Sequence, residues 1–401
     1  MKKMDKVYWL VLLSTCGAIS VSLGLIVNIT GLFFNPIAEE FGLLRGSVSL
    51  TLTLSNFLSA LGGMMMPKLL SEKHLKVGIL LATIGGVCST ILLGLSQSIL
   101  FMYFLHMIRG FCAGLLGLVF ITVVINNWFH ENVGLMTSIA LSFSGLSGAI
   151  FSPIISNVIN NYGWRMGYFV AALFILLLDL PSLLFLPSLK PQTKGYLPYG
   201  YVEEENPSTL QTTSTTSISQ IYFVICCMFG FIASGSTSLI QHFPGISSSY
   251  GFNAAVGAMM LSIGMVANSV AKIILGYLID HFGSKKPILL HCLIMILSVL
   301  LFLFFHTPMM LYISAFLYGY IYSLANVAMV TLAKDLFDRE NYSKTYPTFS
   351  MFGTVGTAVS ASGIGYIYDF THSYTPVFLL LLGLFILNTL FVLYCYRKPI
   401  Q

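Results

Sequence analysis

A lysine stands in the middle of a long apolar stretch of the chain. Lys272 lies in a run that begins near Ala254 and ends at Asp280, eight residues after the lysine. Eight residues of α-helix span about 12 Å, roughly twice the reach of a lysine stem. A cation at the centre of such a run costs about 2.5–3.5 kcal/mol on membrane-insertion scales, so its presence needs a reason. Two explanations stay open: an ammonium that binds an anion in a water-filled cavity, and a structural lysine whose stem snorkels toward the interface.

The helix face around Lys272 favours the first explanation. Asn268 lies one turn before the lysine and Gly276 one turn after it, with Gly264 and Ser269 nearby. Small and polar side chains on one face suit a watery cavity better than lipid. We therefore expect Lys272 and Asn268 to bind the anionic group of a small substrate.

Three further ionisable residues lie in apolar runs, namely Arg109, His106 and Asp179. His106 precedes Arg109 by three residues, so a helix places both on the same side. Arg109 is either a coupling residue or a buried arginine bonded to backbone carbonyls, and Asp179 is either functional or paired at the interface. Lys272 and Arg109 against Asp179 leave excess positive charge, which an arriving carboxylate would balance. Proton coupling would then fall to Lys272 or His106, because Asn268 cannot titrate and Asp179 lies toward the cytoplasmic end.

Polar stripes on other apolar runs are candidates for the lining of the same cavity. Their candidate substrate-contacting members are Asn28 in the first run, His242 in the seventh, and Tyr318, Tyr322 and Asn326 in the tenth. The alternative for each stripe is close helix packing through small residues.

Composition determines which elements must carry these side chains. The 401 residues are 56% hydrophobic and only 8% charged, whereas soluble globular chains carry about a quarter charged residues. The hydrophobicity falls into runs of about 20 residues, the length at which a helix crosses a bilayer. The runs do not alternate apolar and polar residues, which excludes a membrane β-barrel. We predict an all-α membrane protein.

Twelve spans follow from the hydropathy, six on each side of a hydrophilic gap. We expect an N-terminal half over 1–187, a cytoplasmic linker over 188–218 and a C-terminal half over 219–401. The predicted spans are 7–33, 47–69, 77–96, 98–125, 134–159, 166–187, 219–243, 254–279, 287–305, 309–332, 348–367 and 374–396.

Basic residues predict the orientation of these spans. Fifteen of the 19 Lys and Arg residues fall in loops on the side of the N-terminus, and only Arg45 and Arg165 fall on the other side. Cytoplasmic loops carry the excess of basic residues in membrane proteins. Both termini are therefore expected in the cytoplasm, with the chain in the cell membrane.

Several classes of function lack sequence support. The seven cysteines form no CxxC or Cys/His ligand pattern, so we expect neither disulfides nor a metal site, and no cofactor. Loops and linker leave no room for a folded soluble domain, so we expect no enzyme and no nucleic-acid partner. The expected partners are a small organic anion, protons or a counter-anion, and lipid, with the chain acting as a monomer.

Two six-helix halves joined by a cytoplasmic linker resemble the major facilitator superfamily. The stretch "GYLIDHFGSKK" is similar to that superfamily's loop signature, whose positions here are Gly276, Asp280, Gly283, Lys285 and Lys286. The resemblance implies a gating role for this loop and a cavity lined by helices 1, 4, 7 and 10. "RGFCAG" and "SGLSGAIFSP" resemble the helix-4 and helix-5 motifs of the superfamily. The first-half copy of the loop is degenerate, with Pro67 at the aspartate position.

A narrower likeness points to the monocarboxylate-porter and oxalate/formate-antiporter branch. It rests on "NNWF", "YGWRMGYF", "KGYLPYG", "KDLF" and "IYDFTHSY", which occur in order at span ends. The resemblance implies a substrate-binding cation in helix 8, where this chain has Lys272. Departures are Asn28 where animal carriers have a lysine, Asn268 where they have an aspartate, and no lysine within 348–367. One deep cation fits one carboxylate better than two.

These observations predict a secondary active transporter of a small organic anion, most simply a monocarboxylate. It would work by alternating access and be either proton-coupled or an anion exchanger. One alternative is an exporter of drugs or other neutral or cationic amphiphiles, which would favour acidic residues in the cavity. Another is a membrane sensor that binds without transporting, which would normally carry an output domain.

Overall fold

The computed structural model describes residues 5–70, 72–131, 133–186, 188–201, 220–337 and 339–397. The chain is almost wholly helical over these residues, and one isolated parallel bridge joins Phe129 to Tyr199. Eleven helical segments of the described residues are long and apolar enough to cross a membrane. The helix α16 (Arg339–Thr371) occupies the position of the eleventh predicted span and completes the twelve. The structure is thus the all-α, two-half fold that the hydropathy predicts.

The first half contains six transmembrane helices, several of them built from two segments. Its elements are α1 (Lys6–Ile19), η1 (Ser20–Asn28), α2 (Gly31–Phe41), α3 (Arg45–Leu69), η2 (Glu72–His74), α4 (Leu75–Leu95), α5 (Ile99–Leu115), α6 (Leu118–Trp128), α7 (Val133–Tyr162) and α8 (Trp164–Phe185).

The second half repeats this arrangement after the short helix η3 (Pro191–Lys194). Its elements are α9 (Gln220–Ser236), η4 (Thr237–His242), α10 (Phe243–Ser249), α11 (Ala254–Phe282), α12 (Lys285–Phe304), α13 (Pro308–Tyr318), α14 (Ile321–Ser323), η5 (Leu324–Ala328), α15 (Met329–Leu336), α16 and α17 (Thr375–Cys395).

Irregular backbone is concentrated in transmembrane helices 1, 4, 7 and 10. Helix 1 contains the π-helical segment η1, and helix 7 contains the 3₁₀ segment η4. Helix 4 is interrupted after Leu115, and helix 10 is interrupted at Gly319 and then passes through the π-helical segment η5. The other helices are continuous over their described lengths. Interrupted transmembrane helices are the usual place for transporter sites, because their backbone groups are available to neighbours or ligands.

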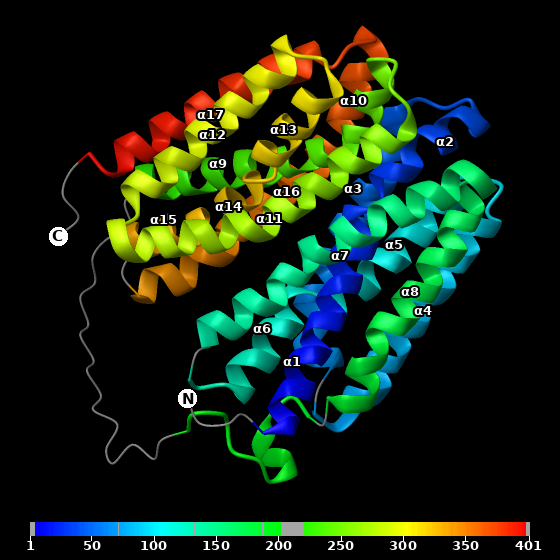
Figure 1. The fold of residues 1–401 in the computed structure, drawn as a ribbon. Coiled ribbons are helices and arrows are strands. Elements are labelled where there is room, and N and C mark those ends of the chain that lie inside the picture. Colours follow the sequence, from blue (N-terminus) through cyan, green and yellow to red (C-terminus); the bar gives the residue numbers. More distant parts are fainter. Residues whose placement is uncertain are drawn as a thin grey trace.

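The two halves meet along two pairs of long helices, α7 with α11 and α3 with α16. In the first pair Ser269 Oγ donates to Ser142 O at 2.9 Å, and Ser262 Oγ donates to Ala149 O at 2.6 Å. Small residues permit this approach, since a Cβ on Gly145 would lie 2.5 Å from Met265 O. The bundles meet at the end that carries α2 and α10 and diverge toward the end that carries α6 and α15 (Figure 1).

Helices α3 and α16 seal the first of these ends, which we call the closed end; it comprises residues 31–53, 241–245 and 358–374. Thr53 Oγ1 donates to Ala358 O at 2.7 Å, and Gly31 N donates to Gln241 Oε1 at 3.1 Å. Backbones touch here: a Cβ on Gly365 would lie 2.7 Å from Gly46 Cα. Glycine at these positions is therefore a requirement of the packing.

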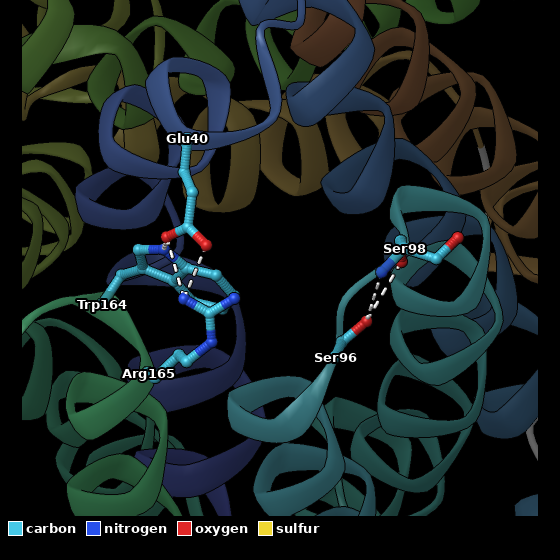
Figure 2. A network of polar contacts seen from close by, with 5 residues as sticks. All are labelled: Glu40, Ser96, Ser98, Trp164 and Arg165. Carbon is cyan, nitrogen blue, oxygen red and sulfur yellow. Dashed lines mark hydrogen bonds and ion pairs between the residues drawn. The ribbon is translucent and has the colours of Figure 1, made fainter.

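A polar cluster of the first half lies beside the closed end. Glu40, in α2, accepts from Trp164 Nε1 at 2.6 Å and forms an ion pair of 2.7 Å with Arg165, both at the start of α8 (Figure 2). The pair is about 40% exposed on each side, so its charges contribute at most about 1 kcal/mol. Its effect is to hold the end of helix 1 against helix 6.

Residues 188–201, the first part of the predicted linker, pack against the first half. Trp128 Nε1 donates to Ser188 O at 3.0 Å, and the amides of Leu189 and Lys190 donate to the carboxylate of Glu72. Tyr8 donates to Leu197 O at 2.9 Å. The rest of the predicted linker, 202–218, lies outside the described residues.

Candidate substrate site between the two halves

Lys272 lies near the middle of α11, on the side where α11 approaches helices of both halves. Its side chain is half-buried, and its ammonium lies 5.7 Å from the centre of the Tyr322 ring. At this distance the ring attracts a cation by about 0.5–2 kcal/mol, depending on desolvation. Within the described residues Lys272 has no ion pair and no hydrogen bond. The ammonium therefore has donors free for a ligand.

Tyr322 connects this lysine to the first half. Its hydroxyl donates to Asn28 Oδ1 at 3.4 Å, and Asn28 Nδ2 donates to Ser144 O at 2.9 Å. Asn28 is the last residue of η1, and Tyr322 lies two residues before η5 begins. The end of η1 thus approaches α14 across the interface, beside Lys272, at a point two residues before η5 begins.

Asn268 and Asn326 complete the polar surroundings of this group. Asn268 is only 1% exposed, its amide lies 4.0 Å from Met265 Sδ, and its Oδ1 has no hydrogen-bond partner. Asn326 is exposed and donates to Tyr322 O at 2.8 Å. Lys272, Tyr322 and Asn28 form one connected cluster, with Asn268 one turn from the lysine.

Tyr318 and His242 make their contacts elsewhere. Tyr318 is fully buried among aromatic rings that include Phe243 and Phe302, and its hydroxyl donates to Ser236 O at 2.9 Å. His242 lies at the closed end, with Nε2 3.0 Å from Ala361 O. Both therefore have satisfied structural contacts in this conformation.

Arg109 and His106 form a second buried group within the first half. Arg109 Nη2 donates to Leu25 O at 3.0 Å, and its guanidinium lies 6.0 Å from the Tyr168 ring centre. The hydroxyl of Tyr168 lies 3.4 Å from His106 Nε2. The bond to Leu25 reaches the backbone of η1, three residues before Asn28. Arg109 thus bonds a backbone carbonyl, which is the arrangement expected of a buried structural arginine.

Asp179 lies inside the first half and not in an ion pair at its edge. It is 1% exposed, one carboxyl oxygen accepts from Thr83 Oγ1 at 3.1 Å, and the other has no partner. Sequence reasoning missed Thr83 and Tyr168 as partners of the buried charged residues. No charge or motif marks either residue, since both belong to ordinary helical runs.

The predicted gating loop follows the end of α11, but few of its signature residues contact other parts of the chain. Gly283 has φ +71° and ends α11, a conformation that glycine adopts without strain. Lys285 Nζ donates to Tyr396 O at 3.1 Å, which ties the loop to the end of α17. Asp280 and Lys286 are exposed, and no atom lies within 4 Å of a Cβ placed on Gly276. Glycine at 276 therefore serves no close helix approach in this conformation.

The closed end contains a charged contact that the sequence patterns did not single out. Asp369 accepts from the amides of Arg45 and Gly46 at 3.1 and 2.7 Å, and the Arg45 guanidinium lies 4.2 Å from the Tyr368 ring centre. Arg45 Nη1 also donates to the hydroxyl of Tyr374 at 3.5 Å. The available signal in the sequence was the aspartate of "IYDFTHSY", just before the twelfth predicted span, 374–396.

Twelve helices in two halves, with a cationic group between them, define a multi-pass secondary transporter. The family model of the Major Facilitator Superfamily matches residues 15–306 and 225–400, and the chain belongs to that superfamily.

Proteins whose sequences are similar to this chain have names that describe different transported substrates. Monocarboxylate transporter 13 of Rattus norvegicus is 22% identical over 382 residues, which cover 92% of this chain and 84% of that protein. Multidrug resistance protein MdtG of Enterobacter lignolyticus is 24% identical over 272 residues. That match covers 67% of this chain and 63% of MdtG, so it spans less than two thirds of the relative.

Solved structures share the fold at low sequence identity. A point mutant of the nucleoside transporter NupG has a TM-score of 0.73 at 13% identity and covers 98% of this chain and 100% of its own. A bacterial homologue of the human lysosomal transporter Spinster, in an inward-facing and occupied conformation, has a TM-score of 0.73 at 13% identity and covers 99% and 98%. These likenesses show the fold alone.

Proposed function

We propose that this protein transports a small organic anion, most simply a monocarboxylate, and that Lys272 binds the anionic group. The observation that carries the proposal is the state of this lysine. It is a half-buried cation between the two halves, beside Tyr322 and Asn28, with no anionic partner in the described chain. A carboxylate arriving there would restore the charge balance and accept charge-assisted hydrogen bonds from the ammonium.

The neutral neighbours of Lys272 support a single carboxylate as cargo. Asn28 and Asn268 carry no charge, and Arg109 is 1% exposed and bonded to Leu25 O in the first half. The site therefore offers one cation to a ligand. A second carboxylate would lose its hydration without gaining a partner, which costs several kcal/mol by general solvation arguments.

Alternating access supplies the transport mechanism. With the orientation expected from the basic residues, the closed end faces the outside and the structure is an inward-facing state of a cell-membrane protein. Opening the closed end would separate α3 from α16, while the helices that diverge at the opposite end would come together. The coupling, by proton symport or anion exchange, belongs to the same proposal.

The likeness to MdtG keeps a second candidate function, the export of neutral or cationic amphiphiles. A cationic substrate would need an acidic partner in the site. Asp179 is the acidic residue that sequence reasoning offered, and it is buried within the first half, bonded to Thr83. The lysine cluster therefore suits an anion better than a cation.

Counterflow in proteoliposomes tests the proposed function. Vesicles preloaded with one unlabelled acid from a panel of small mono- and dicarboxylates would be supplied with the labelled acid outside. We expect labelled monocarboxylate to accumulate transiently in loaded vesicles, with weaker counterflow of dicarboxylates. Counterflow of a cationic dye and of no acid would favour the second candidate.

A further inference from the structure

The carboxyl group of Asp179 is a buried titratable group to which the anion site gives no role. It lies on α8, where one oxygen accepts from Thr83 of α4 at 3.1 Å. The other oxygen has no hydrogen-bond partner, and no Lys or Arg in the described residues forms an ion pair with it. An ionised carboxylate here would be a buried charge stabilised by a single donor.

The surroundings of Asp179 contain almost no space for water. A cavity of about 10 Å³ adjoins it, at or below the least volume that holds one water molecule, about 10–15 Å³. Ser22 of η1, whose hydroxyl also has no partner, lines this cavity together with Asp179. No Lys or Arg of the described residues compensates the carboxyl, and a cavity of this size holds at most one water molecule, so the neutral acid is the form that this environment accommodates.

The other titratable side chains on helices that pack around Asp179 do not pair with its carboxyl group. Cys112 of α5 lines the same cavity. His106 and Arg109 of α5 contact Tyr168, and Lys76 of α4 donates to Leu183 O. Cys16 is the buried thiol of α1, which also packs against α8. None of the basic residues His106, Arg109 and Lys76 bonds Asp179 in the described structure.

The segment η1 connects this carboxyl to the anion site. Its residues Val21, Ser22 and Ile26 line the Asp179 cavity, and its last residue, Asn28, bonds Tyr322 beside Lys272. Leu25, between them, accepts from Arg109. A π-helical segment has looser hydrogen bonding than an α-helix and is a frequent place of functional rearrangement. A shift of η1 would thus alter the Asp179 cavity and the substrate cluster together.

We propose that Asp179 is a proton-binding site of the transport cycle, separate from the anion site and coupled to it through η1. This inference rests on the proposed function, which supplies the organic anion that is transported together with the proton. In the state described here the carboxyl carries its proton. In the opposite state the cavity opens to water of the outer side, and a proton from that water forms the O–H bond of the acid. After the return to the inward-facing state a shift of η1 admits water from the inner side, the O–H bond breaks, and the proton passes to that water. The anion at Lys272 and the proton at Asp179 then cross in the same cycle.

Infrared spectroscopy tests the protonated carboxyl without any substrate. Wild-type protein in vesicles should show the carbonyl stretch of a buried carboxylic acid at neutral pH. Asp179→Asn should abolish this band, Asp179→Glu should move it, and Asp280→Asn, at an exposed aspartate, should leave it unchanged. A spectrum in which neither Asp179 variant alters an acid band would overturn the inference, and either variant alone suffices if the other does not insert.

Transport assays separate this inference from the anion site. With an imposed inward proton gradient and no internal substrate, wild type should accumulate the acid found by counterflow. Asp179→Asn should retain counterflow but lose at least about tenfold of the proton-driven accumulation, whereas Lys272→Gln should lose both. The proton site would be rejected if Asp179→Asn accumulated the acid as wild type does. It would also be rejected if wild-type protein only exchanged one acid for another and showed no proton-driven accumulation. Failure of wild type to move any acid would reject the proposed function and, with it, the coupling part of this inference.

Discussion

The carboxylate of Asp369, near the end of α16, accepts a hydrogen bond of 2.7 Å from the backbone amide of Gly46, in the first turn of α3. Its other oxygen accepts from the amide of Arg45 at 3.1 Å. The first amides of a helix lack partners within the helix and carry its partial positive charge. Asp369 therefore caps a helix of the opposite half, and this cap exists only while the two halves meet.

Asp369 should stabilise the closed end. Helix caps contribute about 0.5–2 kcal/mol, so Asp369→Ala should shift the conformational equilibrium toward opening by roughly 2- to 30-fold. The measurement is the distance distribution between spin labels at Leu44 and His372, on the two sides of this end. Glu39→Gln is the matched control, because Glu39 lines the same surface hollow as Asp369 but does not cap α3. Equal distributions in wild type and Asp369→Ala would contradict this role.

Two glycines of α16 provide a steric test of the same contact. A Cβ on Gly365 would lie 2.7 Å from Gly46 Cα, whereas one on Gly363 would meet no atom within 4 Å. Overpacking costs about 1–3 kcal/mol, so Gly365→Ala should open this end in the spin-label measurement and Gly363→Ala should not. The idea fails if the two alanine variants behave alike.

The hydroxyl of Tyr322 can be tested apart from its ring. Tyr322→Phe keeps an aromatic face near the Lys272 ammonium but removes the hydrogen bond to Asn28 Oδ1. A net hydrogen bond is worth about 0.5–1.5 kcal/mol, so half-saturation in counterflow should rise by up to about tenfold. Tyr322→Leu, which also removes the ring, should weaken binding further. A leucine variant as active as the phenylalanine variant would show that the ring does not assist the lysine.

Much of the fold could be predicted because hydropathy depends on local sequence. Runs of apolar residues located the helices, yet the eleventh prediction, 348–367, falls short of α16, Arg339–Thr371. Hydropathy detects the part of a helix inside the hydrocarbon, whereas the backbone bonding continues beyond it. The interruptions in helices 1 and 10 were invisible for a similar reason, since no proline or charge marks η1 or η5.

The candidate site could be predicted only in part. Lys272 was found because its charge is exceptional in an apolar run. Its contact with Tyr322 and the bond from Tyr322 to Asn28, 294 residues apart in sequence, depend on how two halves meet. Helical periodicity identifies a face but not its neighbour. Tyr318, on the same predicted stripe as Tyr322, bonds Ser236 O and lies within an aromatic cluster.

Substitution of Lys272 tests the central claim most directly. Counterflow of the transported acid would be measured for wild type, Lys272→Gln, Lys272→Arg and the control Lys190→Gln, all reconstituted at equal amounts of folded protein. We predict that Lys272→Gln abolishes counterflow, because the amide cannot balance the charge of a carboxylate. Lys272→Arg should retain part of it, and Lys190→Gln, at an exposed position outside the gating loop, should match wild type. Counterflow by Lys272→Gln at the wild-type level would contradict the assignment of this lysine as the anion-binding residue.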